Sequence, residues 1–407
     1  MSASLRVPTA PHRAAPRTSP PPSPSPGDAT ALLDAYRPGT DRFLASSRQT
    51  LLASGTAAEV PHDSRPLSTR VHEVLDARRR AGAPAPIVVG ALPFSPDAPP
   101  SLAVPQSVRR APALCEDPLI ALPGPVTEPG TWQTREVPAA ADYAASVAAA
   151  VRRMRAGEFD KVVLARTLEL TSSHDLDLPA MVRRLAQHDP RGYTFAVPSG
   201  PGRTLVGASP ELLVARSGNV LTANPLAGSA PRSNDLAEDV RRAATLLESP
   251  KDLHEHAVVV AAVREALAPF CVSLDVPERP TLVRTAAMWH LSTTVTGTLA
   301  DPAASSLDLA SALHPTPAVC GTPTDTARAV IAESEPFERG AYTGMVGWQD
   351  ADGDGEWVVT IRCAEAEGRS LRLFAGAGVV AASSPEAETA ETGAKFRTFL
   401  SAVGAAL

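Results

Sequence analysis

The sequence has few cysteines and no cysteine motif. Its four cysteines, Cys115, Cys271, Cys320 and Cys363, lie far apart, without a CxxC pair or the cysteine–histidine spacing of a metal site. Dense cysteine frameworks are typical of small secreted domains, which depend on disulfides. We therefore expect reduced thiols in an intracellular, cytoplasmic protein.

Long apolar runs and long basic runs are also missing. No apolar segment approaches the roughly 20 residues that a membrane-spanning helix needs. The formal net charge is −6, and no long basic run offsets it. Neither nucleic acid nor a membrane is therefore an expected partner.

The first 28 residues lack the apolar core of a secretory signal and contain no acidic residue before Asp28. Their arginines and serines also occur in organellar transit peptides, but the run PPPSPSP would break the amphipathic helix of such a peptide. Residues 1–28 have almost nothing to bury and are predicted to be a disordered tail. The chain is 44% hydrophobic overall, ample for a core, and residues 29–407 are expected to form a single domain.

Apolar strand-like segments and helical segments arrive in groups. Residues 86–94 look like a buried strand and the proline-rich 98–106 like a surface loop. Further strands are predicted at 159–170, 193–199, 203–209, 211–217, 220–226, 342–348, 356–366 and 370–380. Helices are predicted at 139–156, 234–249, 251–270, 308–313 and 327–335. This grouping favours an α+β fold with large antiparallel sheets over a doubly wound parallel sheet.

The most informative segment is 384–395, SPEAETAETGAK. Ser384 can cap a helix whose first residue is Pro385. Glu388, Glu391 and Lys395 would then share one face of that helix. The face could be a solvated surface with an ordinary Glu391–Lys395 pair, or it could hold a cation between its carboxylates.

Three other charged residues stand in apolar surroundings. Lys161 begins the strand DKVVLAR, and buried lysines lose their proton more easily, although a strand-end lysine can also simply reach solvent. Glu211 leads into an apolar strand and could cap backbone amides in a turn. Glu255 is spaced helically with apolar residues, an awkward place for an unpaired carboxylate, but the helix dipole favours acids near a helix start.

Arg362 lies inside the predicted strand 356–366, among apolar residues. A guanidinium there usually pairs with a carboxylate of the protein or of a ligand. His256 and His290 could bind a metal, but a lone histidine more often has a structural role. The glycines of FAGAGVV, residues 374–380, could let a ligand anion approach the backbone or could relieve crowding in a bend.

Taken together, collinear segments between about residues 158 and 395 resemble the chorismate-utilising enzymes, and most closely the isochorismate synthases. The resemblance is weak before about residue 140. The matching segments are FDKVVLAR, VGASPELLV, NPLAGSAPR, LLESPKDLHEHAVVV, HLSTTVTG, LHPTPAVCGTP, SEPFERGAYTGMVGW, WVVTIRCAE and AGAGVVAASSPEAETAETGAK. One small departure is that NPLAGSAPR has Ser229 and Ala230 where we expect threonine and arginine.

The resemblance implies a fold of large antiparallel sheets packed as a sandwich with helices outside. It implies that Lys161 is the general base that activates water and Glu211 the general acid. It also implies Mg²⁺, held by Glu255, Glu388 and Glu391. The residues that would contact chorismate are His290, Ala318, Val319, Tyr342, Arg362, Gly376 and Lys395.

Within this family the expected reaction depends on a few positions. Aminodeoxychorismate synthases have a nucleophilic lysine where this chain has Ala227, and anthranilate synthases have an amide where it has Lys161. Salicylate synthases share Lys161 and add a pyruvate elimination, but they typically have threonine in place of Ala318. The expected activity is therefore isochorismate synthase, with salicylate synthase as the alternative. A non-catalytic relative that binds a small dicarboxylate would lack catalytic groups that are all present here.

The resemblance further suggests a monomer, and the segment HPTPAVCGTP is most like siderophore-type enzymes. We expect a downstream enzyme to consume the isochorismate, because the bonds formed and broken are of similar kind and the reaction is close to reversible. Catecholate siderophores, menaquinone and salicylate-derived products all remain open as the pathway.

Overall fold

The structure is a computed structural model that describes residues 25–124 and 131–404. The predicted disordered tail, residues 1–28, lies outside the described residues as far as residue 24. Its last residue, Asp28, is the first residue of helix α1 (Asp28–Asp34). Among the helices of these two ranges, none combines the length and the apolarity that a membrane span requires.

The largest sheet contains ten of the described strands, and all of its strand pairs are antiparallel. In spatial order they are β18 (Gly321–Thr322), β8 (Lys161–Ser172), β22 (Ser370–Val380), β21 (Cys363–Glu367), β10 (Arg203–Ser209), β9 (Tyr193–Gly200), β1 (Asp41–Ala45), β2 (Thr50–Ser54) and β6 (Ser107–Ala111), with β7 (Trp132–Val137) also paired to β8.

A second sheet has nine strands and a third has three, again all antiparallel. The second contains β14 (Cys271–Asp275), β17 (Val295–Leu299), β12 (Val220–Asn224), β11 (Leu212–Ser217), β20 (Gly355–Val359), β19 (Met345–Asp350), β4 (Ile87–Leu92), β5 (Ser101–Val104) and β3 (Ala58–Glu59). The third contains β13 (Leu226–Pro231), β16 (Met288–Ser292) and β15 (Thr281–Arg284).

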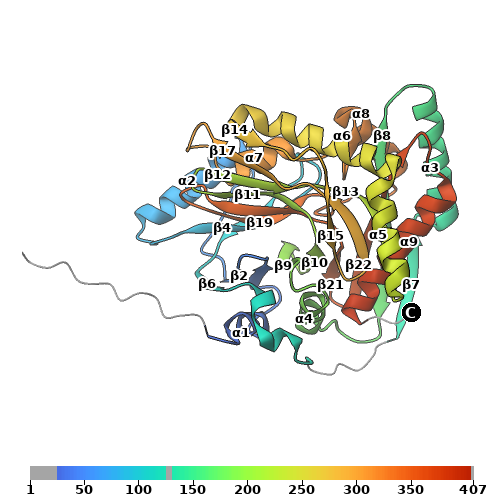
Figure 1. Ribbon diagram of the computed structural model, residues 1–407. Coiled ribbons are helices and arrows are strands. Elements are labelled where there is room, and N and C mark those ends of the chain that lie inside the picture. Colours follow the sequence, from blue (N-terminus) through green and yellow to red (C-terminus); the bar gives the residue numbers. More distant parts are fainter. Residues whose placement is uncertain (1–24, 125–130, 405–407) are drawn as a thin grey trace, which may run out of the picture.

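The two large sheets face each other and the helices cover them from outside (Figure 1). Phe195 and Leu205 of the ten-stranded sheet share one buried cluster with Val346 and Val358 of the nine-stranded sheet. The remaining helices are α2 (Leu67–Arg80), α3 (Ala140–Arg155), α4 (Leu178–His188), α5 (Leu236–Glu248), α6 (Pro250–Leu267), α7 (Ser306–Leu313), α8 (Thr324–Ser334) and α9 (Pro385–Val403), with short 3₁₀ turns at Leu114–Glu116, Pro118–Ala121 and Ala268–Phe270. The predicted α+β sandwich is confirmed.

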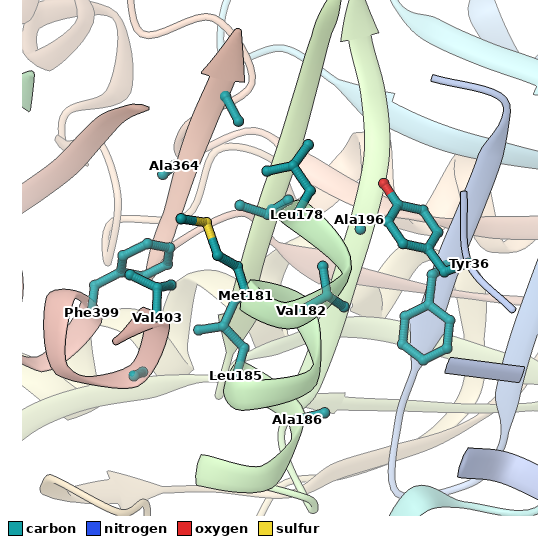
Figure 2. Packing of buried hydrophobic residues seen from close by; sticks show 14 of the residues in the cluster. Tyr36, Leu178, Met181, Val182, Leu185, Ala186, Ala196, Ala364, Phe399 and Val403 are labelled. Carbon is teal, nitrogen blue, oxygen red and sulfur yellow. The ribbon is translucent and has the colours of Figure 1, made fainter. Parts of the chain in front are cut away.

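Helix α4 fills the outer face of the ten-stranded sheet between α9 and the N-terminal segment. Figure 2 shows Met181 and Val182 of α4 between Phe399 of α9 on one side and Tyr36, just after α1, on the other. Apolar residues on successive turns of α4 therefore anchor the last helix of the described chain to the sheet. That anchoring fixes the position of the charged face at the start of α9.

The start of α9 follows the sequence prediction. The Ser384 hydroxyl accepts a hydrogen bond from the backbone N–H of Ala387, and Pro385 occupies the first turn. The first N–H groups of a helix have no acceptor within the helix. Ser384 provides an acceptor for one of them, and Pro385 has no N–H that needs one. The helix ends at Val403 and is followed by Gly404, which has a φ of 74° and a left-handed conformation that suits glycine.

Two of the predicted elements are wrong. The loop predicted at 98–106 contains strand β5, which pairs with β4 and buries Leu102 and Val104. The strand predicted at 356–366 is broken at residues 360–362: β20 belongs to the nine-stranded sheet and β21 to the ten-stranded sheet. Arg362 therefore lies not in a strand but in the link between the sheets, with a φ of 51°.

Candidate active site

A cavity of about 210 Å³ lies among the ten-stranded sheet, the three-stranded sheet, helices α6 and α9, and loops that flank strands of the nine-stranded sheet. All but one of the predicted site residues line it: Glu211, Glu255, His290, Ala318, Val319, Tyr342, Arg362, Gly376, Glu388, Glu391 and Lys395. The exception is Lys161, which reaches the cavity through its contact with Glu255. Residues up to 234 positions apart in the sequence, from 161 to 395, therefore meet at one place.

Lys161 is held at the edge of the cavity by the pairing of β8 with β22. It lies opposite Val380 in that register, and its side chain is buried. Its Nζ is 2.7 Å from Glu255 Oε1 of helix α6. A buried ammonium needs such a partner, because an unpaired charge in the interior is strongly unfavourable.

Glu211 is buried at the point where the chain enters β11. Burial raises the pKa of its carboxyl to about 8, although a backbone N–H of Leu226 and the charge of Lys161 both act to lower it. The group therefore keeps its proton at neutral pH. A carboxyl that holds a proton and an amine that can accept one are the kind of pair that acid–base chemistry requires.

Three carboxylates from two helices surround the same cavity. Glu255 comes from α6, and Glu388 and Glu391 lie one turn apart on α9. Burial and the nearby Glu391 raise the pKa of Glu388, against a hydrogen bond from Ser383 and the charges of nearby lysines. Burial would also raise the pKa of Glu391, but Lys395 and its other basic neighbours outweigh it and lower that pKa.

The carboxylates suit a hard divalent cation in kind, because Mg²⁺ prefers oxygen ligands. In this structure two of them instead contact lysine side chains. Lys395 Nζ lies 2.7 Å from Glu391 Oε1, and Lys161 Nζ lies 2.7 Å from Glu255 Oε1. Within residues 25–124 and 131–404, no group of three or more His, Cys, Asp or Glu side chains has the geometry of an assembled metal site.

Positive charge and a hydroxyl also face the cavity. The Arg362 guanidinium makes no hydrogen bond or ion pair with any described residue, and burial lowers its pKa against the charge of Glu391. Lys395 Nζ also donates to the carbonyl oxygen of Gly376 at 2.7 Å. Tyr342 stacks on Phe374, with ring centroids 4.9 Å apart, and burial raises its pKa. These groups are suited to bind an anionic ligand.

His290 is a neutral, buried imidazole at the cavity wall. Its Nδ1 lies 2.6 Å from the Ser229 hydroxyl, opposite it in the β13–β16 pair. Burial, together with the charges of Arg362 and Lys395, lowers its pKa to about 3. Its Nε2 has no hydrogen-bond partner among the described residues, so it is available to a ligand. His256 is instead a structural residue, because its two ring nitrogens contact the Ala227 carbonyl and the Thr293 hydroxyl.

The two glycines of β22 that line the cavity are there for space rather than for a bend. A Cβ at Gly376 would come within 2.8 Å of the Tyr342 hydroxyl. A Cβ at Gly378 would lie 3.1 Å from both Glu255 Oε1 and Lys161 Cε. The groups that approach these glycines are protein side chains, so the glycines relieve crowding within strand β22, and the approach of a ligand anion stays a prediction.

Sequence reasoning missed several residues of the cavity wall. Lys251 precedes Glu255 by one helical turn on α6, and this i, i+4 spacing was a usable signal. Gly228 and Ser229 line the wall from β13, and Thr343 from a turn where its φ is 58°. Their places depend on strand pairing and on a turn between sheets, which no local pattern encodes.

Comparison with known proteins gives consistent matches. Residues 120–404 match a protein family described as chorismate binding enzyme. The chain is 52% identical over 385 residues to isochorismate synthase DhbC of Bacillus subtilis strain 168, covering 92% of this chain and 96% of that protein. It is 40% identical to the vibriobactin-specific isochorismate synthase of Vibrio cholerae, covering 92% and 94%.

The fold also matches solved structures. A crystal structure of DhbC from Bacillus anthracis, named as a 2,3-dihydroxybenzoate-specific isochorismate synthase, superposes with a TM-score of 0.87 at 49% sequence identity. The match covers 92% of this chain and 99% of that one. The likeness therefore extends over the sheets, the outer helices and the cavity together.

Proposed function

Because the chain belongs to the chorismate binding enzyme family, we propose that it is an isochorismate synthase, an isomerase that converts chorismate to isochorismate. The observation that carries this proposal is that a candidate base and a candidate acid meet at one cavity. A buried lysine, Lys161, and a carboxyl that keeps its proton, Glu211, stand beside groups suited to a dianion. The identity with proteins named isochorismate synthase supports the same activity.

The reaction requires that one proton be removed from the attacking water and that another be supplied to the departing hydroxyl. Water adds at C2 of chorismate, the ring double bonds shift, and the C4 hydroxyl leaves. Lys161, in its neutral form, accepts the proton that the attacking water loses, and Glu211 gives its proton to the departing hydroxyl, which leaves as water. Each such transfer is typically worth about 10²–10⁴-fold in rate.

The remaining residues hold the substrate in place. Chorismate carries two carboxylates, and Arg362 with Tyr342 would hold the enolpyruvyl carboxylate. Lys395 and Gly376 would assist in binding carboxylates. Ala318, Val319 and His290 would line the part of the cavity that surrounds the ring of chorismate. Orientation of this kind removes much of the entropic cost of bringing reacting groups together.

We propose Mg²⁺ as the cofactor, held by Glu255, Glu388 and Glu391. When bound, the ion would supply positive charge against the ring carboxylate of the substrate. The oxygen-rich donor set and the repulsion between Glu388 and Glu391, which helps to raise the pKa of Glu388, support this assignment.

The pathway and cellular setting are proposals on the same basis. Two relatives bear names linked to 2,3-dihydroxybenzoate and vibriobactin, which favours siderophore biosynthesis. We propose that the protein works in the cytoplasm as a monomer, and that a downstream enzyme consumes isochorismate and draws a nearly reversible reaction forward.

Product analysis tests the proposed function. The purified protein is incubated with chorismate and Mg²⁺, and the products are separated by chromatography and identified by mass. Isochorismate alone is the expected result. Salicylate with pyruvate would instead indicate the alternative, salicylate synthase, and unchanged chorismate would indicate a non-catalytic binding protein.

A further inference from the structure

The chain uses lysine only around this cavity. It has 38 lysines and arginines together, and just three of them are lysines: Lys161, Lys251 and Lys395. Lys395 and Lys251 line the cavity, and Lys161 contacts Glu255 at its edge. Arginine supplies nearly all other positive charge in the chain. An ordinary surface cation in this chain is an arginine, so the lysine at position 251 calls for a specific reason.

The compact ammonium of lysine differs from guanidinium in ways that matter at a small polar site. It is a point charge on a flexible stem, with three donors that can rotate toward a carboxylate. Two of the three lysines already have fixed partners. Lys161 contacts Glu255 and Lys395 contacts both Glu391 and the Gly376 carbonyl, each at 2.7 Å.

Lys251 is the lysine without a fixed partner. It lies in the first turn of α6, is exposed to solvent, and forms no hydrogen bond or ion pair with any residue that the structure describes. It lines the same cavity as Glu388 and Glu391 and stands one helical turn before Glu255 on α6. A side chain that lines a cavity and also reaches solvent stands where a ligand must pass.

We propose that Lys251 is a substrate-binding residue at the mouth of the cavity, which draws in chorismate and holds one of its carboxylates. The inference rests on the proposed function for the identity of the dianion. It assigns to Lys251 a role in capture, so loss of its charge should weaken binding more than it slows the chemical step. Attraction of this kind also weakens as salt increases.

Amine labelling reads out this contact without an activity assay. Isotopic reductive methylation of the native protein, followed by peptide mass spectrometry, reports the three lysines separately. Lys251 should label fastest, and saturating chorismate should slow its labelling several-fold. Turnover during labelling does not disturb the test, because chorismate and isochorismate are both dianions.

The labelling outcomes separate this inference from the proposed function. Protection of Lys161 and Lys395 without protection of Lys251 would overturn the role of Lys251 and leave the site intact. Protection of none of the three would overturn the proposed site itself. Protection of all three is the expected result.

Kinetics provides the second measurement. For Lys251→Ala we expect a KM for chorismate about tenfold higher, with kcat changed less than about threefold, as for loss of one charged contact. The dependence of kcat/KM on ionic strength should also become shallower. Lys251→Arg keeps the charge but not the compact ammonium, so its KM should lie between those of the wild type and Lys251→Ala.

Arg264→Ala is the matched control, since Arg264 is an exposed cation on the same helix that does not line the cavity. It changes the net charge equally and should leave KM unchanged. An unchanged KM in Lys251→Ala, or an equal rise in both variants, would overturn the assignment.

Discussion

Arg339 and Glu335 form an ion pair inside the protein, with 2.6 Å between Nη2 and Oε1 and each side chain only 3% exposed. The Arg339 guanidinium also donates to the carbonyl oxygens of Val163 and Val319, and Glu335 accepts from the backbone N–H of Ala165. The pair thus joins β8 to the segment that carries Val319 at the cavity wall. It fixes the site without contacting the cavity itself.

Breaking this pair should destabilise the fold. Removing one partner of a buried ion pair leaves the other charge uncompensated, at a cost of about 3–5 kcal/mol. We expect Arg339→Met and Glu335→Gln each to lower the free energy of unfolding in urea by about that amount. Arg153→Met, which removes a half-exposed partner of Glu158 and Glu333, should cost about 0–1 kcal/mol. Equal losses in the three variants would contradict this account.

Lys161 and Glu211 should be essential for turnover but not for folding. We expect Lys161→Ala and Glu211→Gln each to lower kcat by about 10²–10⁴-fold, because each removes one proton transfer. Circular dichroism should show an unchanged fold. Glu386→Gln, an exposed carboxyl on α9, is the control and should keep full activity. Near-normal turnover in either of the first two purified variants would remove that residue from the mechanism.

The stability of the protein should depend on pH through Glu211. Burial raises the pKa of its carboxyl from 4.5 to about 8, so between these values the folded state holds a proton that the unfolded chain has released. This contribution to stability is complete below pH 4.5 and is lost as pH rises through 8. Glutamine carries no such proton. The melting temperature of Glu211→Gln, relative to that of the wild type, should therefore rise steadily between pH 5 and 8.5. A difference in melting temperature that stays constant over this range would place the pKa of Glu211 near its ordinary value.

Removal of divalent metal should abolish turnover, and added Mg²⁺ should restore it. Binding is measured independently as a rise in thermal stability, since an ion at 100 times its dissociation constant adds about 2.7 kcal/mol to the free energy of unfolding. We expect Glu388→Gln to lose this rise and Glu386→Gln, two residues earlier on α9, to keep it. Activity indifferent to chelator, together with no stabilisation of wild type by Mg²⁺, would exclude the metal site.

Local sequence signals predicted the elements whose structure depends on local chemistry. Ser384 and Pro385 specify the start of α9, and this fixes which of its side chains share a face. The break at residues 360–362 was not predictable in the same way, because all three neighbours of Arg362 on its N-terminal side favour strands. The chain leaves one sheet for the other there, and the reason lies in the packing between sheets.

The candidate site shows the same division. A lysine at a strand start, an acid before a strand and two acids one turn apart were each visible locally, and the family resemblance joined them. Ser229 and Thr343 were not visible, because the first reaches the cavity through its pairing with β16 and the second through a turn of positive φ. Cavities of this kind are made by tertiary contacts, so their full lining emerges only in three dimensions.

Helix α9 follows every other element of the described chain, yet it supplies Glu388, Glu391 and Lys395. During translation, the cavity therefore cannot be complete until the segment that forms α9 has left the ribosome. A nascent or prematurely terminated chain that lacks α9 would contain Lys161 and Glu211 but would lack one wall of the cavity.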